Sequence, residues 1–295
     1  MRLCRFNDKH VGVVIDDHVY DITELLTDIP RPSWPYPPQD WLIASMLTEH
    51  ARLAATLAEL HNAPGSRFPR IKLADLTLQA PVANPGKIIG APVNYRAHID
   101  EANADEQISY SRAIGTLEDH GLFLKANTAL IGPDGEIELP FPDRRTDHEV
   151  ELGVIIGQPA RRVTRDEAMQ HVFGYCVALD ITVRGKEFPG FRKSPDTFAV
   201  IGPWVTTADE IANPNALDLA LSVNGEMRQQ SNTQHLILNV ERLIEYASAM
   251  YTLMPGDVIM TGTPAGVGPI EPGDLLEATV DGLGQLVVSV AQSRD

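Results

Sequence analysis

The sequence predicts a β-rich α+β fold with few helices. Short stretches of alternating or continuously apolar residues, bounded by turn residues, recur along the chain, and strand signals outnumber helix signals. The two kinds of signal do not alternate regularly, which argues against a parallel sheet of strand-helix-strand units. With 295 residues, including 22 Gly and 22 Pro, the chain is long enough for a substantial core in a turn-rich globular protein.

Residues 1–80 are expected to form a small β-rich N-terminal domain with one helix. Turns of the Asn-Asp and Asp-Asp type separate three predicted strands, at residues 2–6, 11–15 and 19–22. Prolines exclude regular structure between residues 30 and 38, because each one removes a backbone donor and restrains its neighbour.

A helix is predicted to begin after Asp40, which is placed to cap it, and to extend to about Leu60. Pro64-Gly65 would end it. The Pro- and Gly-containing segment 80–86 is the predicted domain boundary, so that residues 85–295 form the larger domain.

The larger domain is expected to contain most of the strands and two clear helices. The helices are predicted at residues 165–171, with Thr164 as the N-cap, and at residues 240–250. Hairpins are predicted over the Gly-Pro-Asp-Gly turn between Ile131 and Ile137 and over Asn224-Gly225. Further strands are predicted at residues 87–90, 121–125, 147–157, 172–182, 198–205 and 217–223.

Composition excludes several classes of partner. A formal net charge of -16 and a pI near 4.9 argue against nucleic acid and anionic membrane surfaces, which both require basic protein surface. The basic pairs at residues 144–145 and 161–162 are expected to be solvated. With only two cysteines, Cys4 and Cys176, no disulfide framework is expected. No signal core and no apolar run of about 18 residues is found, so a cytoplasmic location is expected.

The most informative segment is the predicted strand at residues 147–157. Alternate side chains of a strand share a face, so Glu149 and Glu151 are expected to point the same way, roughly 7 Å apart. Two like charges there are costly to desolvate unless a cation lies between them. The alternative is an edge strand whose solvent-exposed face carries two glutamates.

Another acid stands at the end of a buried strand. The apolar run at residues 172–182 includes one carboxylate, Asp180, near its end. A charged group in such a position requires a partner, and a cation shared with the glutamate pair is one candidate.

A long polar stretch covers residues 98–121 and has few apolar anchors. Its composition suits a mobile lid over a site, and the alternative is a solvent-exposed helix. His98 and Glu101 would share one face of a helix there. By itself a His-x-x-Glu pair is commonly a surface pair.

These segments, in this order, resemble the fumarylacetoacetate hydrolase family, in the branch of acylpyruvate hydrolases and hydroxymuconate-type isomerases and decarboxylases. The resemblance extends from about Lys87 to the C-terminus. It rests on the motifs at residues 94–98, 123–125, 149–151 and 261–268, together with Asp180, Arg184 and Lys193. Membership implies a mixed β-roll with few helices, commonly a homodimer. It also implies a site for Mg²⁺ or Mn²⁺ formed by Glu149, Glu151 and Asp180.

The resemblance assigns catalytic roles to three residues outside the metal site. His98 would activate a water, oriented by Glu101. Lys125 would stabilise the developing oxyanion or bind a carboxylate, although a lysine at a strand end is ordinarily solvated.

Substrate contacts are expected from five residues. Arg184 would bind a substrate carboxylate with its guanidinium, with a structural salt bridge as the alternative. The backbone N–H groups of residues 261–268, with Thr263, would hold a carboxylate or oxyanion. Glu187 stands where many members have Gln, which puts that substrate contact in doubt. Tyr95 and Lys193 complete the set.

The function expected from this set is hydrolysis of a carbon-carbon bond in an acylpyruvate-like 2,4-dioxo acid through a metal-stabilised enolate. Isomerisation or decarboxylation of a 2-oxo or 2-hydroxy-dienedioic acid would use the same site. A non-catalytic protein that binds a metal and an organic acid is the alternative of another class. In each case the expected partner is a small 2-oxo acid, and neither nucleic acid nor membrane is expected.

Overall fold

In the computed structural model, which describes residues 1–27, 29–48, 55, 60 and 68–292, the N-terminal segment begins with the three predicted strands. They form an antiparallel meander of β1 (Arg2–Phe6), β2 (His10–Ile15) and β3 (His18–Asp21), which β4 (Arg70–Lys72) and β5 (Leu78–Gln79) extend. Residues 30–38 have no regular structure, as predicted.

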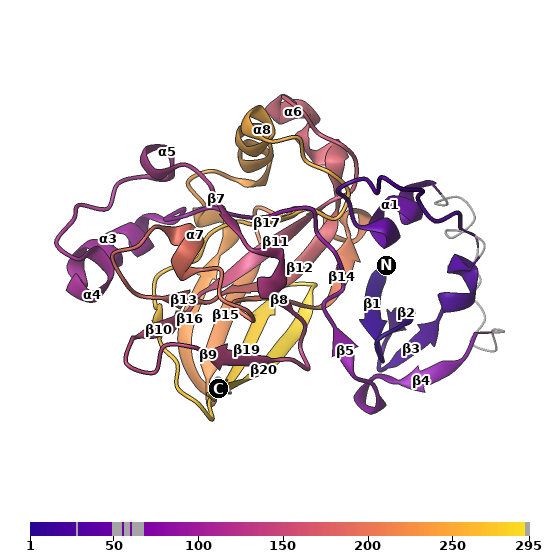
Figure 1. Cartoon of the computed structure of the whole chain (residues 1–295), viewed down its shortest axis with the longest axis horizontal. Coiled ribbons are helices and arrows are strands. Elements are labelled where there is room, and N and C mark those ends of the chain that lie inside the picture. Colours follow the sequence, from indigo (N-terminus) through magenta and orange to yellow (C-terminus); the bar gives the residue numbers. More distant parts are fainter. Residues whose placement is uncertain (28, 49–54, 56–59, 61–67, 293–295) are drawn as a thin grey trace.

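The meander continues into the rest of the molecule, because β1 pairs antiparallel with β14 (Ala199–Thr207), with Leu3 opposite Val205. One 12-stranded sheet therefore spans both parts of the chain (Figure 1). The division into domains of residues 1–80 and 85–295 stays a prediction.

The centre of this sheet is buried on both faces. From β14 the order continues with β12 (Val172–Asp180), β11 (Val150–Ile156), β17 (Val258–Met260), β6 (Ile88–Gly90) and β7 (Phe123–Lys125), and the short β8 (Leu130–Ile131) adds to β14 in parallel. All side chains of β11 are buried, as are all those of β12 after Val172. These buried strands are apolar except for Glu151 and Asp180, and they position the functional site.

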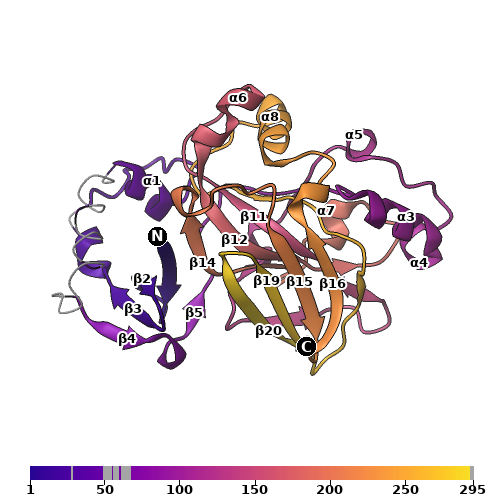
Figure 2. The ribbon, with the colours of Figure 1, turned by 180° about the vertical axis from the view of Figure 1, so that it is seen from behind.

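A second sheet closes the roll. Its order is β16 (Glu226–Asn232), β15 (Asp218–Val223), β19 (Leu275–Val280), β20 (Gly284–Gln292) and β9 (Glu136–Leu139). It packs across β12 and β14 over a shared apolar core, which includes Leu179, Leu221 and Leu286 (Figure 2). A third, three-stranded sheet consists of β10 (Thr146–His148), β13 (Thr182–Val183) and β18 (Gly268–Pro269). The β-rich roll with few helices is confirmed.

Two of the predicted helices are present, one of them with its predicted cap, Thr164. Asn239 caps α8 (Val240–Met250), and Thr164 forms a capping box with α6 (Arg165–Ala168), which continues as a 3-10 turn, η4 (Met169–His171). Asp40 caps α1 (Trp41–Thr48) by accepting from the backbone N–H of Ile43, 3.0 Å away. Most of the predicted continuation to Leu60 lies outside the described residues.

Four short helices lie near one end of the roll or beside it: α3 (Arg96–Ala104), α4 (Glu106–Ser109), α5 (Leu117–His120) and α7 (Pro189–Arg192) (Figures 1 and 2). The remaining 3-10 turns are η1 (Thr23–Leu26), η2 (Leu73–Asp75), η3 (Asn127–Ala129), η5 (Ala208–Glu210) and η6 (Thr233–His235). The stretch at residues 98–121, called the lid segment below, is thus largely helical. The alternative of an exposed helix is wrong for α3, which buries His98, Ile99 and Ala102.

One predicted hairpin is correct and one is wrong. Asn224 and Gly225 have positive φ angles of 52° and 78° and join β15 to β16, as a tight hairpin turn requires. The turn between Ile131 and Ile137 exists, but its flanking strands do not pair with each other. Instead β8 joins β14 and β9 joins β20, both in parallel, because each strand finds a longer partner elsewhere.

The predicted strand at residues 147–157 is two strands, β10 and β11, interrupted at Glu149. It is not an edge strand, because β11 lies between β12 and β17. Among the described residues, no helix is long and apolar enough to cross a membrane.

Candidate metal and acid-base site

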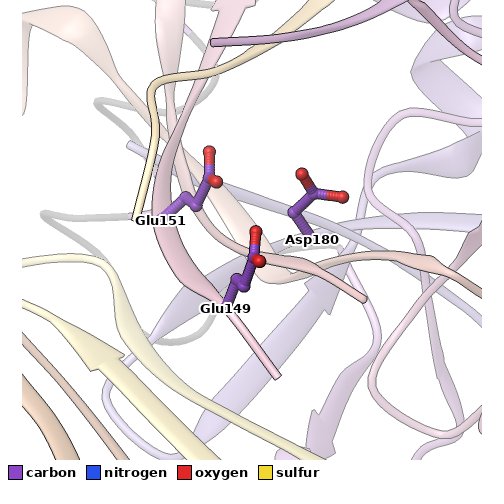
Figure 3. A group of neighbouring side chains, drawn as sticks. All are labelled: Glu149, Glu151 and Asp180. Atoms are coloured by element: carbon purple, nitrogen blue, oxygen red, sulfur yellow. The ribbon is translucent and has the colours of Figure 1, made fainter. Parts of the chain in front are cut away.

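Three carboxylates converge at one end of the central strands. Glu149 lies in the interruption between β10 and β11, Glu151 is the second residue of β11, and Asp180 ends β12. The backbone N–H of Asp180 donates to the carbonyl of Glu149 over 2.9 Å, which makes the two acids cross-strand neighbours. One oxygen from each of the three lies within 4.8 Å of the others (Figure 3).

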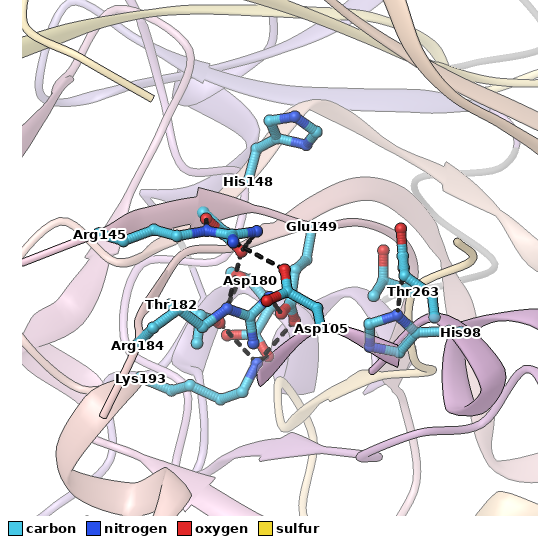
Figure 4. Close-up of polar contacts among 12 residues, drawn as sticks. His98, Asp105, Arg145, His148, Glu149, Asp180, Thr182, Arg184, Lys193 and Thr263 are labelled. Carbon is cyan, nitrogen blue, oxygen red and sulfur yellow. Dashed lines mark hydrogen bonds and ion pairs between the residues drawn. The ribbon is translucent and has the colours of Figure 1, made fainter. Parts of the chain in front are cut away.

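The interruption at Glu149 has a specific partner. The Oε1 atom of Gln229, in β16, accepts the backbone N–H of Val150 over 3.0 Å and lies 3.1 Å from Nδ1 of His148. At this point the side chain of Gln229 accepts the backbone hydrogen bond that a neighbouring strand would otherwise accept. His148 is buried beside it and points away from the carboxylates (Figure 4). Burial lowers the pKa of His148, so its imidazole is neutral at pH 7.

Lys193 lies among the acids. Its Nζ atom donates to Glu149 (2.6 Å), Asp180 (2.7 Å) and Thr182 (2.7 Å), so all three of its donors are used. Burial opposes the charge of Lys193, but the two carboxylates outweigh it and raise the lysine pKa. Burial likewise opposes ionisation of Glu149, yet Lys193 and Arg184 hold the pKa of Glu149 well below its usual range.

Glu151 is different, because no basic side chain contacts it in the described structure. Its carboxylate accepts one backbone N–H, from Gly262 at 2.6 Å. Burial, followed by repulsion from Asp180, raises the pKa of Glu151 well above its usual range. The basic side chains of the site therefore contact Glu149 and Asp180 but not Glu151. Three carboxylates whose oxygens are this close fit a hard divalent cation, which takes oxygen ligands at about 2.0–2.6 Å.

A cavity of about 280 Å³ opens onto these acids. Its lining includes Glu149, Glu151 and Asp180 together with residues 108–110 and 112–114 of the lid segment. His98 lines the same cavity and is 5% exposed. The structure thus places His98 and the three carboxylates around one cavity.

His98 and Glu101 form the expected pair on α3. The His98 Nδ1 atom is 2.9 Å from Oε2 of Glu101, which leaves Nε2 as the ring nitrogen free to act in the cavity. The other oxygen of Glu101 accepts the backbone N–H of Gly266, 2.8 Å away. Glu101 is thereby fixed from two sides, and with it the orientation of the imidazole.

A chain of ion pairs leads from the lid segment to the carboxylates. Arg145 contacts Asp105, which caps α4, over 2.8 Å and Asp147 over 2.7 Å. Arg184 then contacts Asp147 over 2.7 Å and Glu149 over 2.9 Å (Figure 4). The prediction that Arg145 is solvated is wrong, because its guanidinium finds carboxylates on two elements.

Of the other basic residues predicted to be solvated, Arg161 and Arg162 are exposed as predicted, whereas Arg144 is half-buried and paired. Arg144 donates to both oxygens of Glu187 and to the carbonyl of Arg184. Arg161 donates to the carbonyls of Ser248 and Ala249. Arg162 adopts a left-handed φ of 55°, and its backbone N–H donates to the carbonyl of Ser248.

Arg184 and Lys125 are placed differently from what their expected roles require. Two nitrogens of Arg184 are used by Asp147 and Glu149, which corresponds to the alternative of a structural salt bridge. Lys125 is fully buried and contacts Asp180, because a buried ammonium group requires a carboxylate partner. It does not line the cavity described above. Burial lowers the pKa of Lys125, and Asp180 partly offsets this.

The loop at residues 261–268 binds the protein itself. Two of its N–H groups, those of Gly262 and Gly266, hold Glu151 and Glu101, where a substrate carboxylate was expected. The Thr263 hydroxyl lies 2.9 Å from the carbonyl of Val150 and accepts from Gln229, although Thr263 still lines the cavity. The loop therefore fixes the acids in place.

Tyr95 and Glu187 complete the predicted set. Tyr95 is 2% exposed, and its hydroxyl has no partner among the described residues. Burial, then the charge of Glu151, raises the pKa of Tyr95. Glu187 lines the mouth of the cavity, where Arg144 neutralises it.

Sequence reasoning missed four residues that organise the site: Gln229, Asp147, Arg145 and Asp105. Asp147 precedes the glutamate pair in the same segment and could have been noticed on that ground. Gln229 is 79 residues from the N–H that it binds, and nothing local marks it.

The comparison with known families fits this geometry. Residues 87–291 match the family model described as the fumarylacetoacetate (FAA) hydrolase C-terminal domain. The chain belongs to the fumarylacetoacetate hydrolase family. All three carboxylates and the His98–Glu101 pair lie inside the matched residues.

Relatives within the fumarylacetoacetate hydrolase family resemble the whole chain. A maleylpyruvate hydrolase of Aquipseudomonas alcaligenes is 47% identical over 98% of this chain and 99% of its own length. The crystal structure of a maleylpyruvate hydrolase from Sphingobium sp. SYK-6, in complex with manganese(II) and pyruvate, is 41% identical with a TM-score of 0.82, and all of both chains is covered.

A more distant fumarylacetoacetate hydrolase relative carries another activity. The structure of 5-carboxymethyl-2-hydroxymuconate delta-isomerase from Mycobacterium smegmatis is 30% identical with a TM-score of 0.71, covering 99% of this chain and all of the other. The predicted family and the predicted hydrolase class are confirmed, and the relative's manganese complex supports a divalent metal.

Proposed function

We propose that this enzyme hydrolyses an acylpyruvate that carries a second carboxylate, as maleylpyruvate does. The observation that carries the proposal is that His98 and the three carboxylates line one cavity, with Glu101 bound to the imidazole. Two relatives that match along essentially the full chain are maleylpyruvate hydrolases, and one of them was crystallised with pyruvate, which is a product of this reaction.

The reaction requires water to add to the acyl carbonyl and the bond between that carbon and the pyruvate methylene to break. The electron pair of the broken bond passes into the pyruvate portion as an enolate, which a proton then converts to pyruvate. A divalent cation held by Glu149, Glu151 and Asp180 supplies stabilisation of the negative charge that develops at the 2-oxo oxygen.

His98 acts as the general base in this scheme. Its Nε2 atom takes a proton from the water that attacks the acyl carbonyl, and Glu101 stabilises the resulting imidazolium. The N–H of Gly266 holds Glu101 in position, so the loop at residues 261–268 contributes to the orientation of the base. The lid segment carries His98 and Glu101, and its closing would exclude bulk water from the cavity.

The test is turnover with purified protein. Incubation with Mn²⁺ or Mg²⁺ and a panel of acylpyruvates should release pyruvate, measured by coupling to lactate dehydrogenase. Oxaloacetate and a hydroxymuconate-type acid in the same panel detect decarboxylation and isomerisation, which the isomerase relative makes the second candidate. Inactivity towards all substrates, together with retained ligand binding, would favour the non-catalytic alternative.

We further propose Mg²⁺ as the resident ion, with Mn²⁺ as the alternative that the relative's crystal structure supports. A homodimer is the proposed assembly, which light scattering of the purified protein tests. The proposed location is the cytoplasm. It is supported by two cysteines, Cys4 and Cys176, that are buried and free, with pKa values that burial raises to about 12.

A further inference from the structure

One partly buried guanidinium of the cavity, that of Arg192, has no carboxylate partner among the described residues. Arg192 ends α7, is partly buried, and lines the cavity together with His98 and Glu149. Its Nε atom donates to the backbone carbonyl of Glu187 over 2.8 Å. Within the described parts of the chain, neither of its terminal amino groups has a hydrogen-bond or ion-pair partner.

The other buried cations near the acids are already used. Lys193 has three acceptors, Lys125 contacts Asp180, and Arg184 contacts Asp147 and Glu149. The arginine that the sequence favoured as a receptor for a substrate carboxylate is therefore occupied. Arg192 is the neighbouring guanidinium whose two terminal nitrogens remain available.

The surroundings of Arg192 favour an anion. Burial lowers the pKa of Arg192, and the nearby charge of Arg184 lowers it further, so the group lies close to a like charge without a contacting carboxylate. A carboxylate can accept two parallel hydrogen bonds from one guanidinium. The contact with the Glu187 carbonyl fixes the guanidinium in advance, which reduces the entropy lost when a ligand binds.

The carboxylate of Glu187, whose backbone carbonyl Arg192 contacts, is bound by another arginine and does not occupy Arg192. Both oxygens of Glu187 are bound by Arg144, at 3.2 and 2.9 Å. This pair removes a negative charge that would otherwise repel a second carboxylate at the mouth of the cavity.

We propose that Arg192 binds the second carboxylate of the substrate and makes the enzyme selective for dicarboxylic over monocarboxylic acylpyruvates. This inference rests on the proposed function, since it assumes that the 2-oxo acid end lies at the three carboxylates. Arg192 then recognises the end of the substrate that lies away from the three carboxylates.

The experiment compares Arg192→Gln with Arg192→Lys and wild type on maleylpyruvate and on 2,4-dioxopentanoate, which has a single carboxylate. The Gln variant should lose about 10- to 100-fold in kcat/KM for maleylpyruvate, mainly through KM. Its kcat/KM for 2,4-dioxopentanoate should stay within about twofold. The Lys variant keeps the charge but loses the paired donors, so its kcat/KM for maleylpyruvate should lie between those of the wild type and the Gln variant.

A binding measurement keeps the inference testable without turnover. Calorimetry with Mn²⁺-loaded protein compares 2-oxoadipate with 2-oxohexanoate, which lacks the second carboxylate. Arg192→Gln should weaken the first about 10- to 100-fold and leave the second unchanged. Failure of the wild type to cleave either acylpyruvate would overturn the proposed function, whereas this comparison decides the role of Arg192.

Arg112 provides the matched control. It also lines the cavity but is exposed to solvent, and no partner of its side chain is found in the described residues. Arg112→Gln should leave the preference for the dicarboxylic acid unchanged. Loss of that preference in the Arg112 variant, or an equal loss on both acids in the Arg192 variant, would overturn the proposal. The second outcome would place the 1-carboxylate at Arg192.

Discussion

Arg145 and Asp105 lie 2.8 Å apart and connect the lid segment to the segment that carries Glu149, one of the proposed metal ligands. Asp105 also accepts the backbone N–H of Gln107 over 2.8 Å and so caps α4. The same guanidinium holds Asp147, which shares Arg184 with Glu149. The position of the lid segment and the orientation of Glu149 therefore depend on one continuous set of charges.

Replacement of this arginine should loosen the lid segment. In Arg145→Gln, residues 105–109 lose one partner of their cap, and we expect their protection against hydrogen exchange to fall by roughly 1 kcal/mol or less, because the pair is partly exposed. The measurement is amide exchange followed by mass spectrometry. Arg242→Gln, which breaks an exposed pair with Glu245 on α8, is the control. Unchanged exchange at residues 105–109 would contradict the coupling.

Removal of the base should separate catalysis from metal binding. His98→Ala is expected to lower kcat by about 10² to 10⁴, because the attacking water loses its proton acceptor. Glu101→Gln should also lower kcat, because its amide N–H would donate to Nδ1 of His98 and leave the ring proton on Nε2, which can then no longer accept a proton from water. Mn²⁺ affinity should stay within about twofold in both, measured by paramagnetic resonance of the free ion. His10→Ala, which breaks the His10–Asp21 contact elsewhere, is the matched control. Full activity of the His98 variant would refute the assigned role.

Loss of a proposed metal ligand should weaken metal binding. Glu151→Gln removes a charge from the position that has no basic partner, and we expect the affinity for Mn²⁺ to fall by more than about 100-fold, beyond the effect typical of outer partners. Isothermal calorimetry measures it. Glu187→Gln, at the mouth of the same cavity, should retain the wild-type affinity. Equal affinities for wild type and the Glu151 variant would show that the ion binds elsewhere.

The ion should also stabilise the fold. At a free concentration 100 times its dissociation constant, it adds about 2.7 kcal/mol to the free energy of unfolding if it binds only the folded protein. The melting temperature should therefore rise by several degrees on addition of Mn²⁺ and return after chelation. Asp180→Asn should show no such rise, and a rise equal to that of the wild type would point to another site.

Asp40 should matter more than an ordinary N-cap. One of its oxygens accepts the N–H of Ile43, and the other accepts those of Ala83 and Asn84, 3.0 and 2.9 Å away. We expect Asp40→Ala to lower the free energy of unfolding by about 2 to 4 kcal/mol, measured with denaturant. Asn239 caps α8 but accepts only one N–H, so Asn239→Ala should lower the free energy of unfolding by about 1 kcal/mol. Equal losses would show that Asp40 is an ordinary cap.

Local signals in the sequence predicted much of the fold. The Asn224-Gly225 turn, the Thr164 capping box and the apolar run into Asp180 each depend on residues close in sequence, and each was predicted. The partners of β8 and β9 were not, because parallel pairing joins distant strands and leaves no local signal. The short, ambiguous turn between them was therefore assigned to a hairpin that does not form.

The candidate site was predictable where spacing along one strand determines geometry. Glu149 and Glu151 share a face, and Asp180 ends the adjacent strand. The use of each basic side chain was not predictable, because Arg184 and Arg192 differ only in which carboxylates the fold brings to them. Arg184 contacts two carboxylates, whereas Arg192 contacts a backbone carbonyl.

Lys193 has a consequence for metal loading. Its ammonium group contacts Glu149 and Asp180, two of the three carboxylates proposed to hold the ion. An incoming cation would therefore have to compete with a side chain of the protein itself for these two carboxylates.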